Sequence, residues 1–330
     1  MIYTGEHKDK KMITWTINEI CNFNCSYCTQ WHNKKEGIKP IDISKLSESL
    51  HYLDKDWLFL ITGGEPFLEK NFIKICEEIT KRHYISLNTN LSTTNVFDFA
   101  DKINPEKSLF INAAVHIRER EKRDVNLTSY IQKILYLQNN GFNIISYYVA
   151  HPDLFGRMED DIAYLRSRGV RKVRIKIFRG FYKEKYYPFS FSFSEKRYLE
   201  SMEADYPEFE ILNKSNSHYG HLCQSGQKFL TMDRNGDLRR CSSLFKSYGN
   251  LFNKKLRLDI LAKPCPTINC GCPYEGIRNA LEIKGDFVST FKEDVNETSL
   301  KFRRVIHNPK LLRKIKEKTL INFAQWQIRS

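Results

Sequence analysis

The sequence lacks any long apolar run. Although 41% of its 330 residues are hydrophobic, no stretch approaches the roughly 20 consecutive apolar residues that a membrane-spanning helix needs. Its first residues, MIYTGEHKDKKM, also lack the apolar core and the small-residue cleavage site of a secretory signal. We therefore expect a protein without a membrane span that stays in the cytoplasm.

Disulfide bonds are not expected for the nine cysteines, because the cytoplasm is reducing. Clustered cysteines in that compartment are more often metal ligands or reactive thiols. Cys76 stands apart, since it falls on the apolar face of a predicted helix with Phe72, Ile73 and Ile79, and we expect it in the core. The other eight form one group near the N-terminus and one after residue 222.

The net charge of +14 is unevenly distributed, because residues 301–330 contain nine Lys or Arg and one Glu. Apolar residues recur there at roughly helical spacing, which predicts a basic amphipathic helix over residues 300–330. We interpret it as a docked helix with a solvated basic face. The alternative is a surface for an acidic protein, an anionic substrate or nucleic acid, and we consider nucleic acid the least favoured partner.

Strand-like and helix-like patterns alternate over the first 180 residues. Strands are predicted at residues 12–20, 57–62, 84–91, 108–117, 142–150 and 170–178. Helices are predicted at residues 43–53, 69–82, 93–103, 127–140 and 159–168. This alternation indicates a parallel sheet with right-handed crossovers. Because eight such units close a full barrel, six predict an α/β fold with a partial (β/α)6 TIM-like barrel and an open side.

The pattern breaks after residue 180. Residues 181–222 are aromatic and irregular, and we interpret them as a connecting segment with some helix. A small cysteine-rich domain is predicted over residues 223–299, beginning with a β-hairpin that turns on Asn235-Gly236. The predicted basic helix follows from residue 300.

Three cysteines follow the first predicted strand with the spacing C-x3-C-x2-C. Cys21, Cys25 and Cys28 can ligate three irons of a four-iron cluster and leave the fourth iron open. Zinc is the competing interpretation. Structural zinc takes four closed ligands, however, and only His32 lies nearby to complete such a set.

A glycine-rich turn, Gly63-Gly64-Glu65-Pro66, follows the second predicted strand. Ligands of parallel barrels bind at the C-terminal ends of the strands, so this turn is expected beside the cysteine loop. The two glycines permit a close backbone approach, and Glu65 can hold an ammonium group.

With these two motifs, residues 12–180 resemble the radical S-adenosylmethionine (SAM) superfamily. The resemblance implies that the open iron of a [4Fe-4S] cluster chelates the amino and carboxylate groups of SAM. Reduction by a flavodoxin- or ferredoxin-type donor then yields a 5′-deoxyadenosyl radical that abstracts a substrate hydrogen. It also implies that Tyr27 packs against the adenine, and that Gly63, Gly64 and Glu65 contact the methionine amino group.

The fourth strand departs from the family, since it ends at His116 where many relatives carry Ser-x-Asp. Asn90, Asn112 and Ser146 are polar strand residues that are candidates for the missing SAM contacts, with structural roles as the alternative. His116 is a candidate catalytic base, and a histidine that merely caps the strand is the alternative.

Five further thiols lie within 50 residues of one another. The stretch Cys223-x12-Gly236-x4-Cys241 resembles the SPASM extension, or its shorter twitch form, and this resemblance implies a second [4Fe-4S] cluster. Its four ligands would come from Cys223, Cys241, Cys265, Cys270 and Cys272. Which of the last three bind stays open, as does a zinc site, and the surplus thiol is either idle or a hydrogen donor.

The reaction remains open between oxidation and epimerisation of a small polar, sugar-like or anionic metabolite. Arg174 and Lys176 share one face of the sixth strand, which suits a phosphate or carboxylate if it looks into the barrel and is a solvated edge if it looks outward. The alternative function is modification of a ribosomally made peptide, although only about 11 residues precede the first strand, too few for a fused leader-binding domain. RNA modification is less favoured.

Overall fold

The computed structural model describes residues 10–28, 39–54, 56–122, 127–202, 219–220 and 222–267. All of them belong to the first of two compact units, residues 1–277. The predicted basic helix, His32, Cys270 and Cys272 lie outside the described residues. Within the described ranges, no helix has the length and apolar character needed to cross a membrane.

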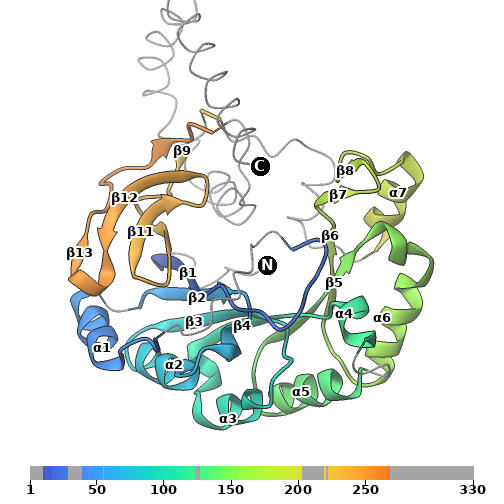
Figure 1. Ribbon diagram of the computed structural model, residues 1–330, viewed down its shortest axis with the longest axis horizontal. Coiled ribbons are helices and arrows are strands. Elements are labelled where there is room, and N and C mark those ends of the chain that lie inside the picture. Colours follow the sequence, from blue (N-terminus) through green and yellow to red (C-terminus); the bar gives the residue numbers. More distant parts are fainter. Residues whose placement is uncertain are drawn as a thin grey trace, which may run out of the picture. The chain divides into compact units, whose positions relative to one another are not determined.

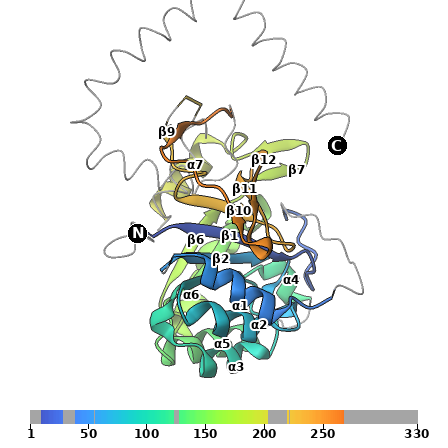
Figure 2. The same ribbon diagram turned by 90° about the vertical axis from the view of Figure 1, so that its left-hand side faces the viewer.

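Six parallel strands, neighbours in chain order, form one continuous part of a large sheet, with β6 at its edge. They are β1 (Met12–Asn18), β2 (Leu58–Gly63), β3 (Tyr84–Thr89), β4 (Ser108–Ala114), β5 (Ile144–Ala150) and β6 (Val173–Ile177). The main connecting helices are α1 (Ile43–Tyr52), α2 (Phe72–Thr80), α3 (Asn95–Lys102), α5 (Thr128–Asn139) and α6 (Met158–Ser167). The sheet curves with these helices along its outer face (Figures 1 and 2). The predicted fold class, an α/β partial barrel, is confirmed.

The core lies between the sheet and the helices. Alternate strand residues such as Ile13, Trp15 and Ile17 of β1 are fully buried there with residues of the helices. The residues between them point to the inner face of the sheet, because successive side chains of a strand alternate. This alternation fixes which side chains can meet a ligand inside the barrel.

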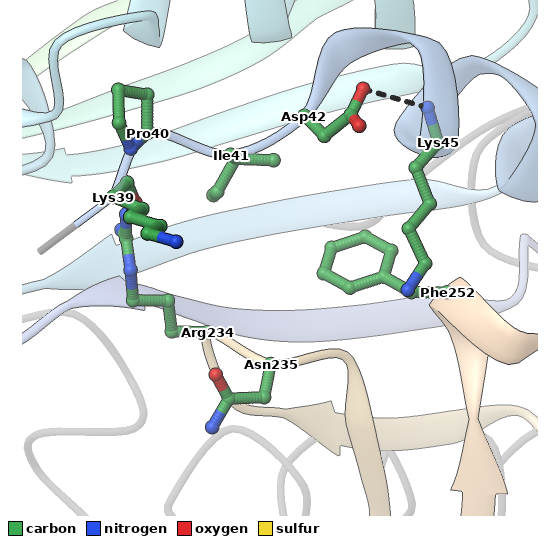
Figure 3. Close-up of a pocket in the computed structure, with 8 residues that line it drawn as sticks. All are labelled: Lys39, Pro40, Ile41, Asp42, Lys45, Arg234, Asn235 and Phe252. Atoms are coloured by element: carbon green, nitrogen blue, oxygen red, sulfur yellow. Dashed lines mark hydrogen bonds between the residues drawn. The ribbon is translucent and has the colours of Figure 1, made fainter.

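Local signals in the sequence explain where the helices begin and end. Asp42 caps α1, since its Oδ1 accepts hydrogen bonds from the backbone N–H groups of Ser44 (2.9 Å) and Lys45 (3.1 Å; Figure 3). Gly141, with φ +85°, follows the last turn of α5. The predicted C-cap at Asn139-Asn140-Gly141 is therefore confirmed.

The predicted hairpin is present as β10 (Phe229–Met232) and β11 (Asp237–Cys241). It joins the barrel sheet instead of building a core of its own, because β10 pairs with β1 in parallel. The strands β12 (Leu244–Asn250) and β13 (Lys255–Leu256) continue the same sheet. This pairing covers the open edge of β1. The strands β10 to β13, which follow the predicted boundary at residue 222, therefore belong to the same sheet as the barrel strands.

Five short elements of the described residues escaped the sequence analysis because they are too brief to show a period. The helix α4 (Ile117–Glu121) follows β4, and the hairpin of β7 (Gly180–Tyr182) and β8 (Lys185–Tyr187) follows β6. The strands β9 (Leu222–Cys223) and β14 (Lys263–Pro264) pair with each other. The helix expected in the connecting segment is α7 (Phe193–Ser201).

Candidate functional site

The glycine turn after β2 lies directly against the chain that leads into the cysteine loop. Gly64 donates its N–H to the carbonyl of Asn18 (3.1 Å), and Glu65 donates its N–H to the carbonyl of Ile20 (2.7 Å). A Cβ atom on Gly64 would lie 2.1 Å from the carbonyl oxygen of Ile20. The expected position of the turn beside the cysteine loop is confirmed. The backbone that Gly64 approaches closely is that of Ile20, directly before the loop.

Glu65 joins the ends of β2 and β3. Its side chain is fully buried, and burial raises its pKa. Oε1 accepts hydrogen bonds from Thr89 Oγ1 (2.7 Å) and from the N–H of Phe67 (3.1 Å), while Oε2 accepts one from the N–H of Asn90 (2.6 Å). The carboxylate therefore has three donors within the chain, and its contact with SAM stays a prediction.

Asn90 connects the end of β3 to the cysteine loop. Its Nδ2 donates to Asn22 Oδ1 (3.1 Å) and lies 3.8 Å from the Sγ of Cys21. The N–H of Phe23 also points to this sulfur, at 3.4 Å. N–H donors aimed at a sulfur stabilise its thiolate form, which is the form that ligates iron.

The three thiols of the loop differ in burial. Cys21 and Cys25 are partly buried and Cys28 is exposed. Burial raises the pKa of Cys25 to about 12, and Glu119 and the other two thiols add to this effect, so the thiols lie close enough to interact. No three His, Cys, Asp or Glu side chains of the described residues are spaced for one metal ion. Three cysteine thiolates are the donors that a four-iron cluster with one open iron takes, and the binding of such a cluster by this loop stays a prediction.

Side chains of the short helix α4 contact the cysteine loop. Glu119 accepts a hydrogen bond from the N–H of Asn24 (3.3 Å). Arg120 is buried and donates to the carbonyls of Val115 (Nε, 2.5 Å), Ala114 (Nη2, 3.3 Å) and Asn90. Its guanidinium also lies 5.3 Å from the centre of the Phe23 ring. Sequence reasoning missed both residues, because the run IRERE has the composition of an exposed helix.

We expect Arg120→Met to loosen the cysteine loop. It would leave buried carbonyls without a donor, at a cost of about 1–3 kcal/mol each, and a chelator should then strip iron from the reconstituted protein faster. Arg118→Met is the matched control on the same helix, since Arg118 forms an exposed ion pair with Asp153. Equal rates of iron loss in the two variants would contradict the role of Arg120.

His116 lies at the end of β4 with a left-handed backbone (φ 48°). Its Nδ1 is 2.9 Å from the hydroxyl of Tyr27. Burial, reinforced by the charge of Arg120, lowers the pKa of His116 to about 3, so the ring is neutral. The tautomer of the ring decides whether Nδ1 accepts this hydrogen bond from the phenol or donates it, and therefore which ring nitrogen is basic.

Tyr27 belongs to an aromatic group at the C-terminal ends of β4 to β6. Its ring centre lies 5.8 Å from those of His116 and His151 and 6.1 Å from that of Phe178. His151 was missed, although its position directly after a predicted strand is the signal that identified His116. The contact of Tyr27 with adenine stays a prediction.

The two remaining polar strand candidates face opposite sides of the sheet. The hydroxyl of Ser146 lies 2.7 Å from that of Tyr130 on α5, which places it on the outer, helix-facing side. The expectation that Ser146 contacts SAM is therefore not supported. Asn112 donates to Asn88 Oδ1 (2.8 Å), and its own buried Oδ1 has no partner among the residues that the structure describes.

Arg174 and Lys176 point to the inner face of the barrel. Ile175 and Ile177, which alternate with them, are buried in the core shared with α6. Lys176 Nζ lies 5.8 Å from the centre of the Tyr147 ring, and its charge contributes to the lowered pKa of His116. Of the two orientations that the sequence left open, the structure has the inward one.

Three of the five later cysteines lie in segments that Arg240 connects through hydrogen bonds. Cys223 pairs with Lys263 across β9 and β14, and Cys265 follows directly after β14. Arg240, next to Cys241, donates to the carbonyls of Ser225 (2.9 Å) and Lys263 (2.9 Å). The second cluster stays a prediction, since two of its candidate ligands lie outside the described residues.

Comparisons with known proteins agree with this geometry. Residues 15–163 match the family model described as the radical SAM superfamily. A GTP 3′,8-cyclase of Haemophilus ducreyi is 35% identical over 83 residues, 23% of this chain and 24% of the relative. An S-adenosylmethionine-dependent nucleotide dehydratase of Fibrobacter sp. is 31% identical over 90 residues, 25% of this chain and 26% of the relative. Each match thus spans about a quarter of the relative's length.

Solved structures share the fold over a larger part of the chain. Native anSMEcpe with bound AdoMet has a TM-score of 0.52 and 15% identity, and the similarity covers 73% of this chain and 78% of that one. Streptococcus suis SuiB bound to S-adenosylmethionine has a TM-score of 0.52 and 11% identity, over 74% of this chain and 64% of that one. The family match, together with the cysteine loop and the glycine turn that it contains, identifies residues 15–163 as a radical SAM domain.

Proposed function

We propose that this protein is a cytoplasmic enzyme that abstracts a hydrogen atom from a small anionic metabolite. Cys21, Cys25 and Cys28 would hold a [4Fe-4S] cluster that leaves one iron for SAM, with electrons from a flavodoxin or ferredoxin. When bound, the cluster and SAM supply the radical. The observation that carries the substrate class is the inward orientation of Arg174 and Lys176.

The two cations lie on the inner face of the barrel, where we propose that the substrate binds. Lys176 pairs in register with Val149 near the C-terminal ends of β5 and β6, and Arg174 pairs with Tyr147 at the middle of β5. The cysteine loop and His116 lie at the same end of the sheet. Side chains of this kind bind phosphate or carboxylate strongly in a partly dry site. Two relatives are named for GTP and nucleotide chemistry, so a nucleotide is the first anionic substrate to test.

The chain's own residues would orient the substrate and handle its proton. Tyr27, His151 and Phe178 form an apolar wall beside His116, which limits the access of water. If the reaction is an oxidation, the adenosyl radical would take the C–H hydrogen atom, the Tyr27–His116 pair would accept the O–H proton, and the proposed second cluster would accept the remaining electron. If it is an epimerisation, a cysteine among residues 265, 270 and 272 returns the hydrogen.

Peptide modification is the second candidate function. The solved structures of the same fold include anSMEcpe with a bound peptide and SuiB bound to its precursor peptide SuiA. The identities of 16% and 13% support the fold alone. The inward cations favour an anionic small molecule over a peptide backbone.

The test uses the reconstituted protein with SAM and dithionite under anaerobic conditions. We expect a nucleoside triphosphate to stimulate formation of 5′-deoxyadenosine, and Arg174→Gln and Lys176→Gln each to raise its KM about tenfold, since a hydrogen bond to a charged group contributes about 1.5–3 kcal/mol. Lys172→Gln is the matched control, because the Lys172 side chain is exposed and bonds to Asn143 (2.7 Å). Unchanged KM values in both inner-face variants, or stimulation by a peptide alone, would contradict the anionic substrate.

A further inference from the structure

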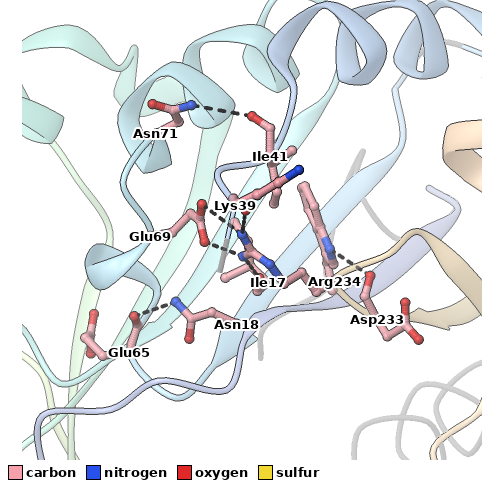
Figure 4. Close-up of polar contacts among 10 residues, drawn as sticks. Ile17, Asn18, Lys39, Ile41, Glu65, Glu69, Asn71, Asp233 and Arg234 are labelled. Carbon is pink, nitrogen blue, oxygen red and sulfur yellow. Dashed lines mark hydrogen bonds and ion pairs between the residues drawn. The ribbon is translucent and has the colours of Figure 1, made fainter. Parts of the chain in front are cut away.

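Arg234 connects the tip of the β10–β11 hairpin to the barrel. Its Nη1 donates to the carbonyl of Ile17 (2.7 Å), and its Nη2 donates to the carbonyl of Lys39 (2.6 Å). Both nitrogens also contact the carboxylate of Glu69, with 3.3 Å between Nη2 and Oε1 (Figure 4). The side chain of Arg234 is only 18% exposed and that of Glu69 only 5%, so this ion pair is largely buried.

Two of the three barrel partners of Arg234, Ile17 and Glu69, adjoin the glycine turn. Glu69 directly follows the 3₁₀ helix Pro66–Leu68, which Glu65 caps at its N-terminus. The N–H of Glu69 donates to the carbonyl of Pro66 (2.9 Å). Ile17 precedes Asn18, whose Nδ2 donates to the carbonyl of Glu65 (2.9 Å; Figure 4). One guanidinium therefore holds both flanks of the turn expected to contact SAM.

The hairpin tip that carries Arg234 is itself rigid. Asp233 Oδ1 accepts hydrogen bonds from the N–H groups of Asn235 (2.9 Å) and Asp237 (3.1 Å), and its carbonyl accepts one from Trp15 Nε1 (3.1 Å). The other end of β11 bears Cys241. These hydrogen bonds hold the turn that connects the strand of Cys241 to Arg234.

Apolar side chains also join the hairpin to the barrel, since Leu230, Met232 and Leu238 are buried in one core with Ile13 and Trp15 of β1. Between the hairpin tip and the start of α1 lies a pocket of about 240 Å³, lined by Asn235 and Phe252 from the hairpin side and by Lys39 and Lys45 from the barrel side (Figure 3). Arg234 also lines this pocket, and its contacts with Lys39 and Glu69 beside the pocket are polar.

We propose that Arg234 and Glu69 are positioning residues that couple the Cys241-bearing hairpin to the SAM-binding turn. SAM affinity then depends on this ion pair, which acts through Gly64 and Glu65. The inference rests on the proposed use of that turn for SAM. Arginine is required because its fork makes several directed hydrogen bonds at once, whereas lysine keeps only the charge.

The test measures the Kd of SAM on the reconstituted full-length protein by anaerobic equilibrium dialysis, together with the urea midpoint of unfolding. We expect Arg234→Lys to weaken SAM binding at least about tenfold, because it breaks the buried fork, while the folded fraction keeps its secondary structure. Lys254→Met is the matched control at the same junction. Its ion pair with Glu48 (2.7 Å) is exposed, so its loss should leave the Kd unchanged.

The outcomes separate this inference from the proposed function. A lower urea midpoint with wild-type SAM affinity in Arg234→Lys would mean a purely structural ion pair and would overturn the coupling alone. If Arg234→Lys does not fold, Glu69→Gln gives the same readout, since it keeps the hydrogen bonds to Ile17 and Lys39. Failure of the wild-type protein to bind SAM would overturn the proposed function and the coupling with it.

Discussion

Replacing Gly64 by alanine is expected to abolish SAM cleavage and to lower the iron content of the protein. The new Cβ atom would lie 2.1 Å from the carbonyl oxygen and 2.4 Å from the carbonyl carbon of Ile20, and 2.9 Å from the nitrogen of Cys21. These are backbone atoms, so no side-chain rotation relieves the overlap. The turn and the cysteine loop have to separate, at a cost on the order of 3 kcal/mol.

Gly156→Ala provides the matched control for this substitution. A Cβ atom on Gly156 would meet nothing within 4 Å, so the same chemical change is expected to leave iron content and SAM cleavage intact. Iron per chain and 5′-deoxyadenosine after reduction are measured for both variants. Normal cleavage by Gly64→Ala would show that the turn does not have to touch the cysteine loop.

Replacing Cys25 by alanine is expected to remove the iron of the first cluster. The wild-type protein with two clusters should hold about eight irons after anaerobic reconstitution, and the variant about four. Because the open iron is the proposed ligand of SAM, cleavage should fall to the background level. Iron and sulfide analysis together with the visible absorption of the cluster measure the change.

Cys76→Ala tests whether iron loss is specific to the loop. Cys76 is a fully buried thiol on α2, in the core with Phe72 and Ile75. Its removal leaves a small cavity and lowers stability, but the iron content should stay at the wild-type value. Four irons in the wild-type protein and none in Cys25→Ala would instead contradict the second cluster.

The sheet and its first site could be predicted from the sequence because their signals are local. Each of the six strands is a short β-prone run between helical periods, and the two motifs follow β1 and β2 directly. The position of ligands at the C-terminal ends of parallel strands is a property of the fold. A common site for the loop of Cys21, Cys25 and Cys28 and the turn at Gly64 could therefore be predicted without knowing any interatomic distance.

The contacts that hold the site together could not be predicted, because they join residues far apart in the chain. Arg234 and Glu69 are 165 positions apart, and Arg120 lies in a five-residue helix whose charges are typical of a surface. Ser146 shows the opposite failure. A polar residue on a buried strand faces either side of the sheet, and only its hydrogen bond to Tyr130 placed it against the helices.

The orientation of Arg174 and Lys176 shows how an ambiguity in the sequence is resolved. Alternation fixed that the two cations share a face, but not which one. Burial of Ile175 and Ile177 against α6 turned the cations inward. The substrate class that we propose depends on this orientation more than on any motif.

The central claim is that the Cys21–Cys28 loop and the glycine turn form a site for reductive cleavage of SAM. The most direct measurement is the amount of 5′-deoxyadenosine formed from SAM by the anaerobically reconstituted wild-type protein after reduction with dithionite. We predict product from the wild-type protein and none above background from Cys25→Ala. An iron-loaded wild-type protein that forms no 5′-deoxyadenosine under any reducing condition would contradict the account.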